Sequence, residues 1–325
     1  GPVVYFVDHF FRDHELIGRL PMEKGDQLHF VDSSSEPEVT RIDAFKEAVS
    51  AADSRTPCCV VGIGGGNALD TAKAVANLLT NPGKAEDYQG WELVKNPAVY
   101  KIGIPTLSGT GSECSRTCVL TNIPKNLKLG MNSDYTVYDQ LLLDPDLLAT
   151  VPRDQYFYTG IDTFMHCVES LQGSYRNAII DAFSVRAVQL CEEIFLSDDM
   201  MSEENREKMM IASYIGGMAA GNVGVIHPFS AGLGVVLHVA HGLGNCLALN
   251  VLGDIYPKEY KQFRTMIERQ GVNLPTGICK DLTEEQYEGL YRGCIVHEKP
   301  LTNALGPDFK QILTRENLIE RYKSI

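Results

Sequence analysis

An aspartate and a histidine four residues apart interrupt an apolar stretch of the sequence, Ile161–Ser170 (IDTFMHCVES). On a helix, Asp162 and His166 share one face a single turn apart, which suits two ligands of one metal ion. Taken alone, such a pair more often forms a hydrogen bond or a salt link on a helix surface. An acid and an imidazole inside an apolar segment therefore need a further partner to explain them.

Further histidines follow in segments that are otherwise apolar and glycine-rich. A buried imidazole without a partner is costly. Asp162 with three histidines would give a divalent ion four ligands and leave a further position for a substrate oxygen. If a nucleotide-binding cleft lies next to it, such an ion would suggest alcohol chemistry, in which the metal favours alkoxide over alcohol and a nicotinamide accepts the hydride. The histidines between Asp162 and residue 241 are His166, His227, His238 and His241.

Two stretches rich in glycine and hydroxyl groups are candidates for holding the phosphates of a nucleotide. Gly62–Lys73 (GIGGGNALDTAK) runs from a strand into a helix, and Pro105–Glu113 (PTLSGTGSE) follows another strand. Glycine amides and the unpaired N–H groups at a helix N-terminus form an anion cradle. A tight turn without a ligand is the alternative for the first stretch alone. Two such loops at the carboxyl ends of neighbouring parallel strands favour nucleotide binding.

The elements that must position these residues alternate between strand and helix in the first half of the chain. Short apolar runs predict four strands, and the third is apolar throughout, which is typical of a strand covered on both faces. Helical patterns lie between them, so we expect a doubly wound, parallel, Rossmann-like α/β sheet. The predicted strands are Val3–Val7, Gln27–Val31, Cys58–Ile63 and Val99–Ile104, and the predicted helices include Asp43–Ala52 and Leu69–Leu79.

Beyond Pro152 the strand signals end and helical periodicity takes over. We expect a nucleotide-binding α/β domain over residues 1–150 and an all-helical, metal-binding domain over residues 151–325. Two domains predict a cleft between them, where small ligands usually bind. The predicted helices of the second domain include Phe157–Leu171, Asn177–Phe195, Ser202–Ala220 and Leu282–Tyr291.

Composition narrows the classes of function. The formal charge is −13, with Lys and Arg dispersed, which argues against a nucleic-acid partner. No apolar run approaches the roughly 20 residues of a membrane span, and the N-terminus lacks a signal-peptide pattern. Nine cysteines without a CxxC pair indicate reduced thiols. We therefore expect a cytoplasmic protein without a membrane partner.

Several motifs resemble those of the iron-containing (group III) alcohol dehydrogenases, and they occur in the same order along nearly the whole chain. Residues 62–73 are similar to the family's GGGS-x-x-D-x-A-K motif, with Asn67 in place of serine. Ile104–Glu113 is similar to P-T-T-x-G-T-G-S-E, with Leu107 where a second threonine is common. Leu142–Pro152 resembles the DP-x-L-x-x-x-x-P joint between the domains, and residues 159–170 resemble T-G-x-D-x-x-x-H-x-x-E.

The resemblance implies a metal site and a preferred ion. A histidine followed fourteen residues later by His-Gly fits the family's remaining ligands, so the implied ligands are Asp162, His166, His227 and His241. The family implies Fe²⁺, and because nitrogen and oxygen ligands accept several divalent ions, Zn²⁺ or Mn²⁺ can substitute. It also implies a homodimer.

The resemblance further implies how the cofactor is held. The implied contacts are Gly65, Gly66 and Asn67 with the pyrophosphate, Thr106 and Thr110 along the cofactor, and Lys128 and Leu147 with ribose and adenine. Asp8 stands where the family keeps an acid that accepts from the adenosine ribose and repels a 2′-phosphate, which favours NAD over NADP. Asp70 supports the glycine loop or approaches the nicotinamide.

Two departures from the family pattern stand out. Many members carry a further histidine, thought to relay the alcohol proton, four residues after the ligand that corresponds to His227. Here that position is Ala231. His238 would take over this role, or water and the cofactor ribose would suffice. The alternative for His238 is a loop histidine bonded to the backbone. The chain also begins directly at its first strand, without the family's usual opening strand.

Three segments are similar to the branch that oxidises the C8 hydroxyl of 3-deoxy-D-manno-octulosonate, the eight-carbon sugar acid of lipopolysaccharide biosynthesis. They are Asn81–Trp91, Met131–Gln140 and Val151–Gly160. An acidic sugar needs a cationic or amide partner near the metal, and the candidates are Arg116, Arg153 and Asn222.

Two other classes of protein compete with a dehydrogenase. Sugar-phosphate cyclases of the dehydroquinate synthase type share the architecture, but they typically use a glutamate as first metal ligand and a compact G-H-T-x-G-H pattern, both absent here. A nucleotide-binding sensor with a vestigial site would be expected to lack a ligand, and all four are present.

Overall fold

The computed structural model describes residues 1–325, which form two compact units. The first comprises Gly1–Leu107 and Ser112–Leu148, and the second comprises Ser108–Gly111 and Ala149–Ile325. The division at Leu148 lies two residues before the predicted boundary at residue 150. The short segment Ser108–Gly111 lies within the predicted first domain but belongs to the second unit.

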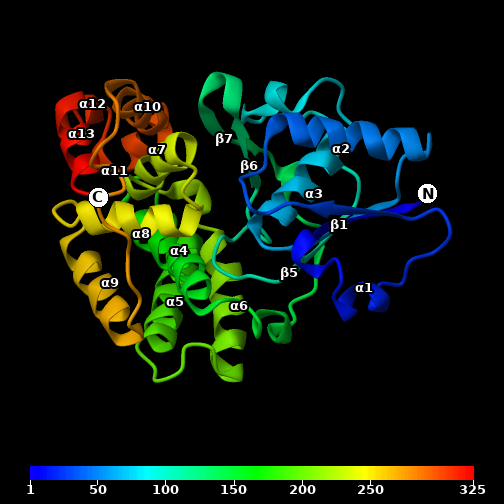
Figure 1. The fold of residues 1–325 in the computed structure, drawn as a ribbon, viewed down its shortest axis with the longest axis horizontal. Helices are drawn as coiled ribbons and strands as arrows, with labels where there is room; N and C mark the ends of the chain where they lie inside the picture. The colour runs from blue at the N-terminus through cyan, green and yellow to red at the C-terminus, as the bar shows by residue number, and fades with distance from the viewer. The chain divides into compact units, whose positions relative to one another are not determined.

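The first unit is built on a parallel sheet of five strands in the order β2-β1-β3-β5-β8. This confirms the predicted doubly wound α/β fold. Helices α2 (Val39–Ala52) and α3 (Gly66–Leu78) follow β2 and β3 and pack against each other (Figure 1). The strands are β1 (Val3–Asp8), β2 (Gln27–Val31), β3 (Cys59–Gly64), β5 (Lys101–Pro105) and β8 (Gln140–Leu141).

Both faces of β3 are covered, as its apolar sequence predicts. Val60 belongs to a core cluster with residues of α2 and α3, whereas its neighbour Val61 belongs to a separate cluster with Tyr5 and Phe11. Successive side chains of a strand point to opposite faces, so the two clusters lie on opposite sides of the sheet. Packing on both faces therefore fixes the position of β3, and with it the start of the glycine stretch.

A second, three-stranded sheet in this unit was not predicted. It consists of β4 (Gly90–Trp91), β6 (Thr117–Asn122) and β7 (Leu127–Asn132), with β6 and β7 antiparallel. The buried positions of β6 include Asn122 beside Cys118 and Leu120, so the apolar alternation that marks a half-buried strand is weak. A short helix, α1 (Glu15–Arg19), was also missed.

The second unit is helical, as predicted (Figure 1). Its central helix α4 is buried along most of its length and contacts α5, α6 and α8, while α7 contacts α8 and α10. The helices are α4 (Arg153–Gln172), α5 (Ala178–Phe195), α6 (Glu203–Gly217), α7 (Ile226–Leu237), α8 (His241–Val251), α9 (Pro257–Gln270), α10 (Glu284–Ile295), α11 (Glu298–Leu305), α12 (Phe309–Ile312) and α13 (Arg315–Lys323).

Local capping determines several of these helix starts. The side chains of Asn177, Ser202 and Thr283 accept backbone N–H groups of the first turns of α5, α6 and α10. Thr283 and Gln286 form a complete capping box. None of the helices is long and apolar enough to cross a membrane.

Candidate metal centre and cofactor loops

Four side chains from three helices of the second unit converge at one point. Asp162 and His166 come from α4, His227 from the first turn of α7, and His241 from the first residue of α8. One ligand atom of each lies within 4.8 Å of those of the others. We call these four residues the Asp/His cluster. Its members are separated in sequence by up to 79 residues (241 − 162), so the fold and not the local helix brings them together.

Asp162 lies at the centre of the Asp/His cluster. Its Oδ1 atom is 3.7 Å from Nε2 of His166 and 3.1 Å from Nε2 of His227, and its Oδ2 atom is 3.6 Å from Nε2 of His241. The rings of His166 and His227 stack with centroids 4.5 Å apart and planes 15° apart. The Nε2 atoms of all three rings therefore face the same carboxylate.

The approach of α8 to α4 depends on a glycine next to the last ligand. A Cβ atom at Gly242 would lie 2.6 Å from the carbonyl oxygen of Tyr158 on α4. Any other residue would push His241 away from Asp162. This explains the glycine of the His-Gly pair in the sequence.

The burial of the Asp/His cluster is uneven. Asp162 and His166 are buried, whereas 29% of the His241 side chain is exposed. The Asp/His cluster is thus most accessible on the side of His241. Exchange of a small ligand at the cluster is easiest from this side.

The pKa values of the Asp/His cluster are shifted in different directions. Burial raises the pKa of Asp162, but the surrounding imidazoles outweigh burial and hold that pKa well below its usual value. Burial lowers the pKa of His166 to about 4. Burial also opposes a charge on His227, but the carboxylates of Glu169 and Asp162 outweigh it and raise its pKa to about 9. Asp162 is therefore a carboxylate and His166 a neutral imidazole at neutral pH.

Glu169, to which the sequence patterns assign no role, supports the Asp/His cluster through His227. It is buried on α4, and its Oε2 atom accepts the Nδ1 proton of His227. Its Oε1 atom accepts the N–H of Ile226 at 2.6 Å and the hydroxyl of Tyr256 at 3.2 Å. Holding Nδ1–H in this way leaves Nε2 of His227 for the ion. The signal in the sequence was a glutamate three residues after His166 in an apolar helix.

The structure does not bring His238 into the Asp/His cluster. His238 caps the C-terminal end of α7 with a φ of 54°, eleven residues after His227. Eleven residues at 1.5 Å each place the two backbones about 16 Å apart along the helix. Ala231, where many relatives carry histidine, is buried one turn after His227. A proton-relay role for His238 stays a prediction.

In the first unit, the glycine stretch forms the expected turn from β3 into α3. Gly65 is the N-cap of α3 and no side chain caps this helix, so its first N–H groups have no intrahelical or capping partner. Gly64 has a φ of +153°, and a Cβ atom there would lie 2.9 Å from Cβ of Asp8 at the end of β1. Asp8 is thus held directly beside the free helix terminus. Such a terminus attracts anions.

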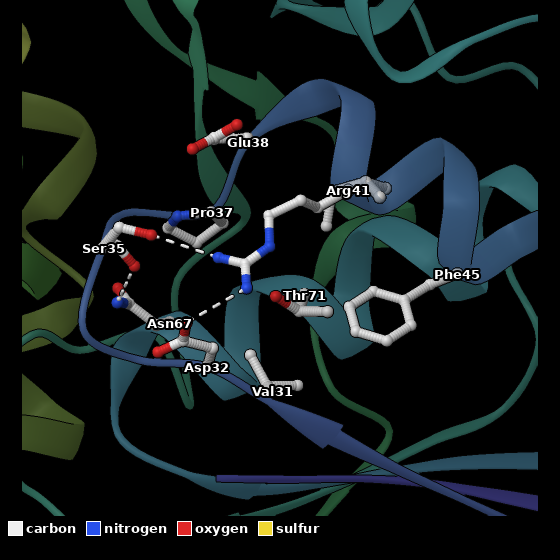
Figure 2. Close-up of a pocket in the computed structure, with 10 residues that line it drawn as sticks. Val31, Asp32, Ser35, Pro37, Glu38, Arg41, Phe45, Asn67 and Thr71 are labelled. Carbon is white, nitrogen blue, oxygen red and sulfur yellow. Dashed lines mark hydrogen bonds and ion pairs between the residues drawn. The ribbon is translucent and has the colours of Figure 1, made fainter. Parts of the chain in front are cut away.

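Asn67 has a different contact from the one that the resemblance implies. Its Nδ2 atom donates to the carbonyl of Ser35 at 2.8 Å and so fastens the loop of residues 32–38, after β2, to the start of α3 (Figure 2). Arg41 on α2 holds the same loop through the Ser35 hydroxyl at 3.1 Å and Asp32 at 3.4 Å. The Asn67 side chain therefore positions a neighbouring loop, and its contact with a pyrophosphate stays a prediction.

Asp70 and Lys73 tie α3 to the end of the second glycine stretch and to the segment that follows it. Asp70 accepts the hydroxyl of Ser112 and the N–H of Val119, the latter at 2.8 Å. Lys73 is fully buried and donates to the carbonyls of Ser112 at 2.8 Å and Ser115 at 3.1 Å. Burial raises the pKa of Asp70. These contacts place Asp70 beside the end of the second glycine stretch, and both of its expected roles stay predictions.

The other implied cofactor residues fall in different places. Thr106 is buried at the end of β5, where its N–H donates to the carbonyl of Gly64 at 3.0 Å. Lys128 is buried on β7 and forms an ion pair of 2.9 Å with Glu36. Leu147 is partly buried in the short 3-10 helix Pro145–Leu148. Thr110 lies in the segment that belongs to the second unit.

The three candidates for binding a substrate carboxylate are already engaged. Arg116 pairs with Glu92 at 2.5 Å and with Asp134 at 2.8 Å. Arg153 donates to Gln270 at 2.8 Å, and the amide of Asn222 donates to the carbonyl of Tyr175 at 3.1 Å. Each of the three side chains therefore already holds at least one partner within the protein.

Comparison with known families identifies the class to which this fold and these motifs belong. Residues 14–145 match the family described as iron-containing alcohol dehydrogenase, and residues 156–289 match the C-terminal part of the same family. Together they cover most of the chain. The chain belongs to the iron-containing alcohol dehydrogenase family, which confirms the resemblance seen in the sequence.

Two relatives are about one third identical to this chain over the residues that align. Sulfoacetaldehyde reductase from Bilophila wadsworthia is 34% identical over 220 residues, which are 66% of this chain and 56% of that protein. NAD-dependent methanol dehydrogenase from Bacillus methanolicus is 32% identical over 208 residues, 63% of this chain and 53% of that protein. The aligned region thus spans a little over half the length of these relatives.

Solved structures share the fold over the whole chain. The alcohol dehydrogenase from Oenococcus oeni has a TM-score of 0.83 at 21% identity, covering 99% of this chain and 91% of that one. Sulfoacetaldehyde reductase from Bifidobacterium kashiwanohense, solved in complex with NAD⁺, has a TM-score of 0.79 at 24% identity, covering 99% and 90%.

Proposed function

We propose that this chain is a metal-dependent alcohol dehydrogenase that oxidises a primary hydroxyl to an aldehyde and transfers the hydride to NAD. The observation that carries the proposal is the convergence of Asp162, His166, His227 and His241 from three helices. Family membership supports the same activity. The names of two relatives, an NAD-dependent methanol dehydrogenase and a sulfoacetaldehyde reductase, describe the two directions of such a reaction.

The residues of the Asp/His cluster fit a divalent ion. They offer one carboxylate oxygen and three imidazole nitrogens, and Oδ2 of Asp162 is buried without a hydrogen-bond partner in the protein. This donor set accepts Fe²⁺, which the family name favours, and also Zn²⁺ or Mn²⁺. When bound, the ion supplies Lewis-acid chemistry that lowers the pKa of an alcohol.

The chain's own residues prepare this site for an alcohol. Glu169 fixes the ring orientation of His227, and the buried surroundings of Asp162 and His166 keep water from their side of the site. The partly exposed His241 marks the side from which an alcohol oxygen reaches the ligands. His238 is the candidate to pass on the alcohol proton, with water and the cofactor ribose as the alternative.

Cofactor binding is assigned to the carboxyl edge of the parallel sheet. The uncapped N-terminus of α3, with Gly65 and Gly66, is the candidate cradle for the pyrophosphate. Asp8 at the end of β1 would accept from ribose hydroxyls and repel a 2′-phosphate, so NAD is preferred over NADP. Thr106, Thr110, Lys128 and Leu147 complete the proposed contacts.

The narrower substrate candidate is the C8 hydroxyl of 3-deoxy-D-manno-octulosonate, which would place the enzyme in lipopolysaccharide metabolism. It is supported by the similarity of three sequence segments. Arg116, Arg153 and Asn222, the candidates to bind its carboxylate, already hold partners within the protein. A homodimer and a cytoplasmic location belong to the same proposal, and they rest on the resemblance and the composition.

The test joins metal analysis to a cofactor screen. The protein is stripped with a chelator, reloaded anaerobically with Fe²⁺, Zn²⁺ or Mn²⁺, and assayed for NADH formation. The panel contains methanol, longer primary alcohols, glycerol and the eight-carbon sugar acid, with sulfoacetaldehyde in the reverse direction. We expect activity with at least one primary alcohol and none in Asp162→Asn. Metal uptake without activity on any substrate would favour a sensor, and the absence of metal uptake would overturn the proposal.

A further inference from the structure

Asn245, to which the sequence patterns assign no role, lies among the residues of the Asp/His cluster. It is fully buried on α8, one turn after His241. Its Nδ2 atom lies 2.7 Å from Oδ1 of Asp162. The same atom lies 3.4 Å from Nε2 of His227 and 3.3 Å from Nε2 of His241. One amide group thus reaches three of the four ligand residues.

The charge of Asp162 determines how this amide is oriented. An amide oxygen only 2.7 Å from a carboxylate oxygen would be repelled, so the NH₂ group must face Asp162. The carbonyl oxygen of Asn245 has no hydrogen-bond partner in the protein. A buried acceptor without a donor destabilises the fold. The bond to Asp162 must therefore offset this cost.

The two oxygens of Asp162 are in different situations. Oδ1 receives the hydrogen bond from Asn245 and lies 3.1 Å from Nε2 of His227 and 3.7 Å from Nε2 of His166. Oδ2 is buried, has no hydrogen-bond partner and lies 3.6 Å from Nε2 of His241. A carboxylate oxygen that already accepts a hydrogen bond from an amide is the weaker of the two ligands. The unoccupied lone pairs of Oδ2 are the ones left for a cation.

We propose that Asn245 is a positioning residue of the metal centre, which holds Oδ1 of Asp162 so that the carboxylate binds the ion through Oδ2 alone. The inference rests on the proposed function, because it requires that the Asp/His cluster holds a metal. Coordination through one oxygen leaves a further position for the substrate alcohol. Removing the amide frees Asp162 to rotate and to bind through both oxygens.

Two variants test this role with Co²⁺, whose visible d–d absorption reports the number of ligands. Asn245→Leu has nearly the same size but no donor, and Asn245→Ser keeps a smaller donor. Affinity is measured by competition with a chromophoric chelator. We expect Asn245→Leu to lose about 10- to 100-fold in Co²⁺ affinity, as is usual for residues that support metal ligands. We also expect its d–d absorption to weaken because Asp162 gains a second contact, with Asn245→Ser intermediate.

Asn205→Ala is the matched control. Asn205 is a buried amide of the same unit, on α6, and donates to Ser197 and to the carbonyl of Asp199, outside the Asp/His cluster. This variant should lose thermal stability but keep the wild-type affinity and spectrum. Wild-type affinity and spectrum in Asn245→Leu would overturn the inference, and if that variant does not fold, the same result in Asn245→Ser decides. A wild-type protein that binds no Co²⁺ would instead overturn the metal centre itself.

Discussion

Glu169 and His227 are joined by a hydrogen bond between a carboxylate on α4 and Nδ1 of an imidazole on α7. Glu169 also accepts the N–H of Ile226 and the hydroxyl of Tyr256, so both of its oxygens are satisfied and its position is fixed. The bond turns Nε2 of His227 toward Asp162, 3.1 Å away. One buried acid thus sets both the tautomer and the direction of a proposed metal ligand.

Glu169→Gln should weaken metal binding while leaving the fold intact. Glutamine keeps the shape and one acceptor oxygen but removes the negative charge that makes His227 a better ligand. We expect the affinity for Zn²⁺ or Co²⁺ to fall about 10- to 100-fold. Chelator competition measures it. Glu193→Gln, which removes an exposed acid paired with Arg186 and Lys208 on the surface, is the control, and equal affinities in the two variants would contradict a role for Glu169.

Metal removal should lower the melting temperature of the protein. An ion bound only by the folded state adds about 2.7 kcal/mol of stability when its free concentration is 100 times Kd. The three helices that carry the Asp/His cluster lose this link when the ion is removed. Differential scanning calorimetry with and without Zn²⁺ measures the shift. Asp162→Asn should show no such shift, and an equal shift in this variant would place the stabilising ion elsewhere.

Lys73→Met should destabilise the first unit. Its ammonium group is fully buried and satisfies the carbonyls of Ser112, Ser115 and Thr117, and it lies 3.7 Å from Asp70. Without it, these carbonyls lose a donor and Asp70 loses its ion pair, which costs about 3 kcal/mol. Urea denaturation followed by circular dichroism gives the difference. Lys125→Met, which breaks an exposed pair with Glu86, should leave the midpoint unchanged.

The sequence predicts the elements of this protein better than the contacts between them. The glycine stretch lies between β3 and α3 as expected, because a strand of apolar residues and a helix pattern flank it. Asp162 and His166 were recognisable as a pair because helix geometry alone places them together. The contribution of Asn245 was not visible in the sequence, since its face of α8 is defined only by how α8 packs against α4. The hydrogen bond from Asn67 to Ser35 was not visible for the same reason, since the two residues lie 32 positions apart in the sequence.

Asn67→Ala should loosen the loop of residues 32–38. The substitution removes the 2.8 Å hydrogen bond to Ser35 but leaves the Arg41 contacts in place. One hydrogen bond of about 1 kcal/mol corresponds to roughly fivefold faster hydrogen exchange in the loop if opening is local. Mass spectrometry of peptides that cover residues 32–38 measures it. Asn96→Ala is the control. It removes an amide that donates to the carbonyl of Thr80, away from this loop, and should leave the exchange rates of residues 32–38 unchanged.

Loosening of this loop should also affect the cofactor, because the loop is fastened to the helix that is proposed to bind the pyrophosphate. We expect Asn67→Ala to raise the KM for NAD more than it lowers kcat. Serine, the residue that the family usually has here, is shorter and should not restore the bond to Ser35, so Asn67→Ser should behave like alanine in the exchange experiment. Wild-type exchange in Asn67→Ser would show that the loop is held mainly by Arg41.

His238 offers a test in which stability and catalysis should respond in opposite directions. With a φ of 54° it occupies the left-handed region at the C-terminal cap of α7, where glycine is usual. His238→Gly removes this backbone strain and should stabilise the protein by up to about 1 kcal/mol, measured by urea denaturation. If the imidazole relays the alcohol proton, the same variant should lose one limb of the pH profile of kcat/KM. His238→Ala lacks the relief of strain and should change the pH profile in the same way. An unchanged profile in both variants would leave the proton to water and the cofactor ribose, whatever the effect on stability.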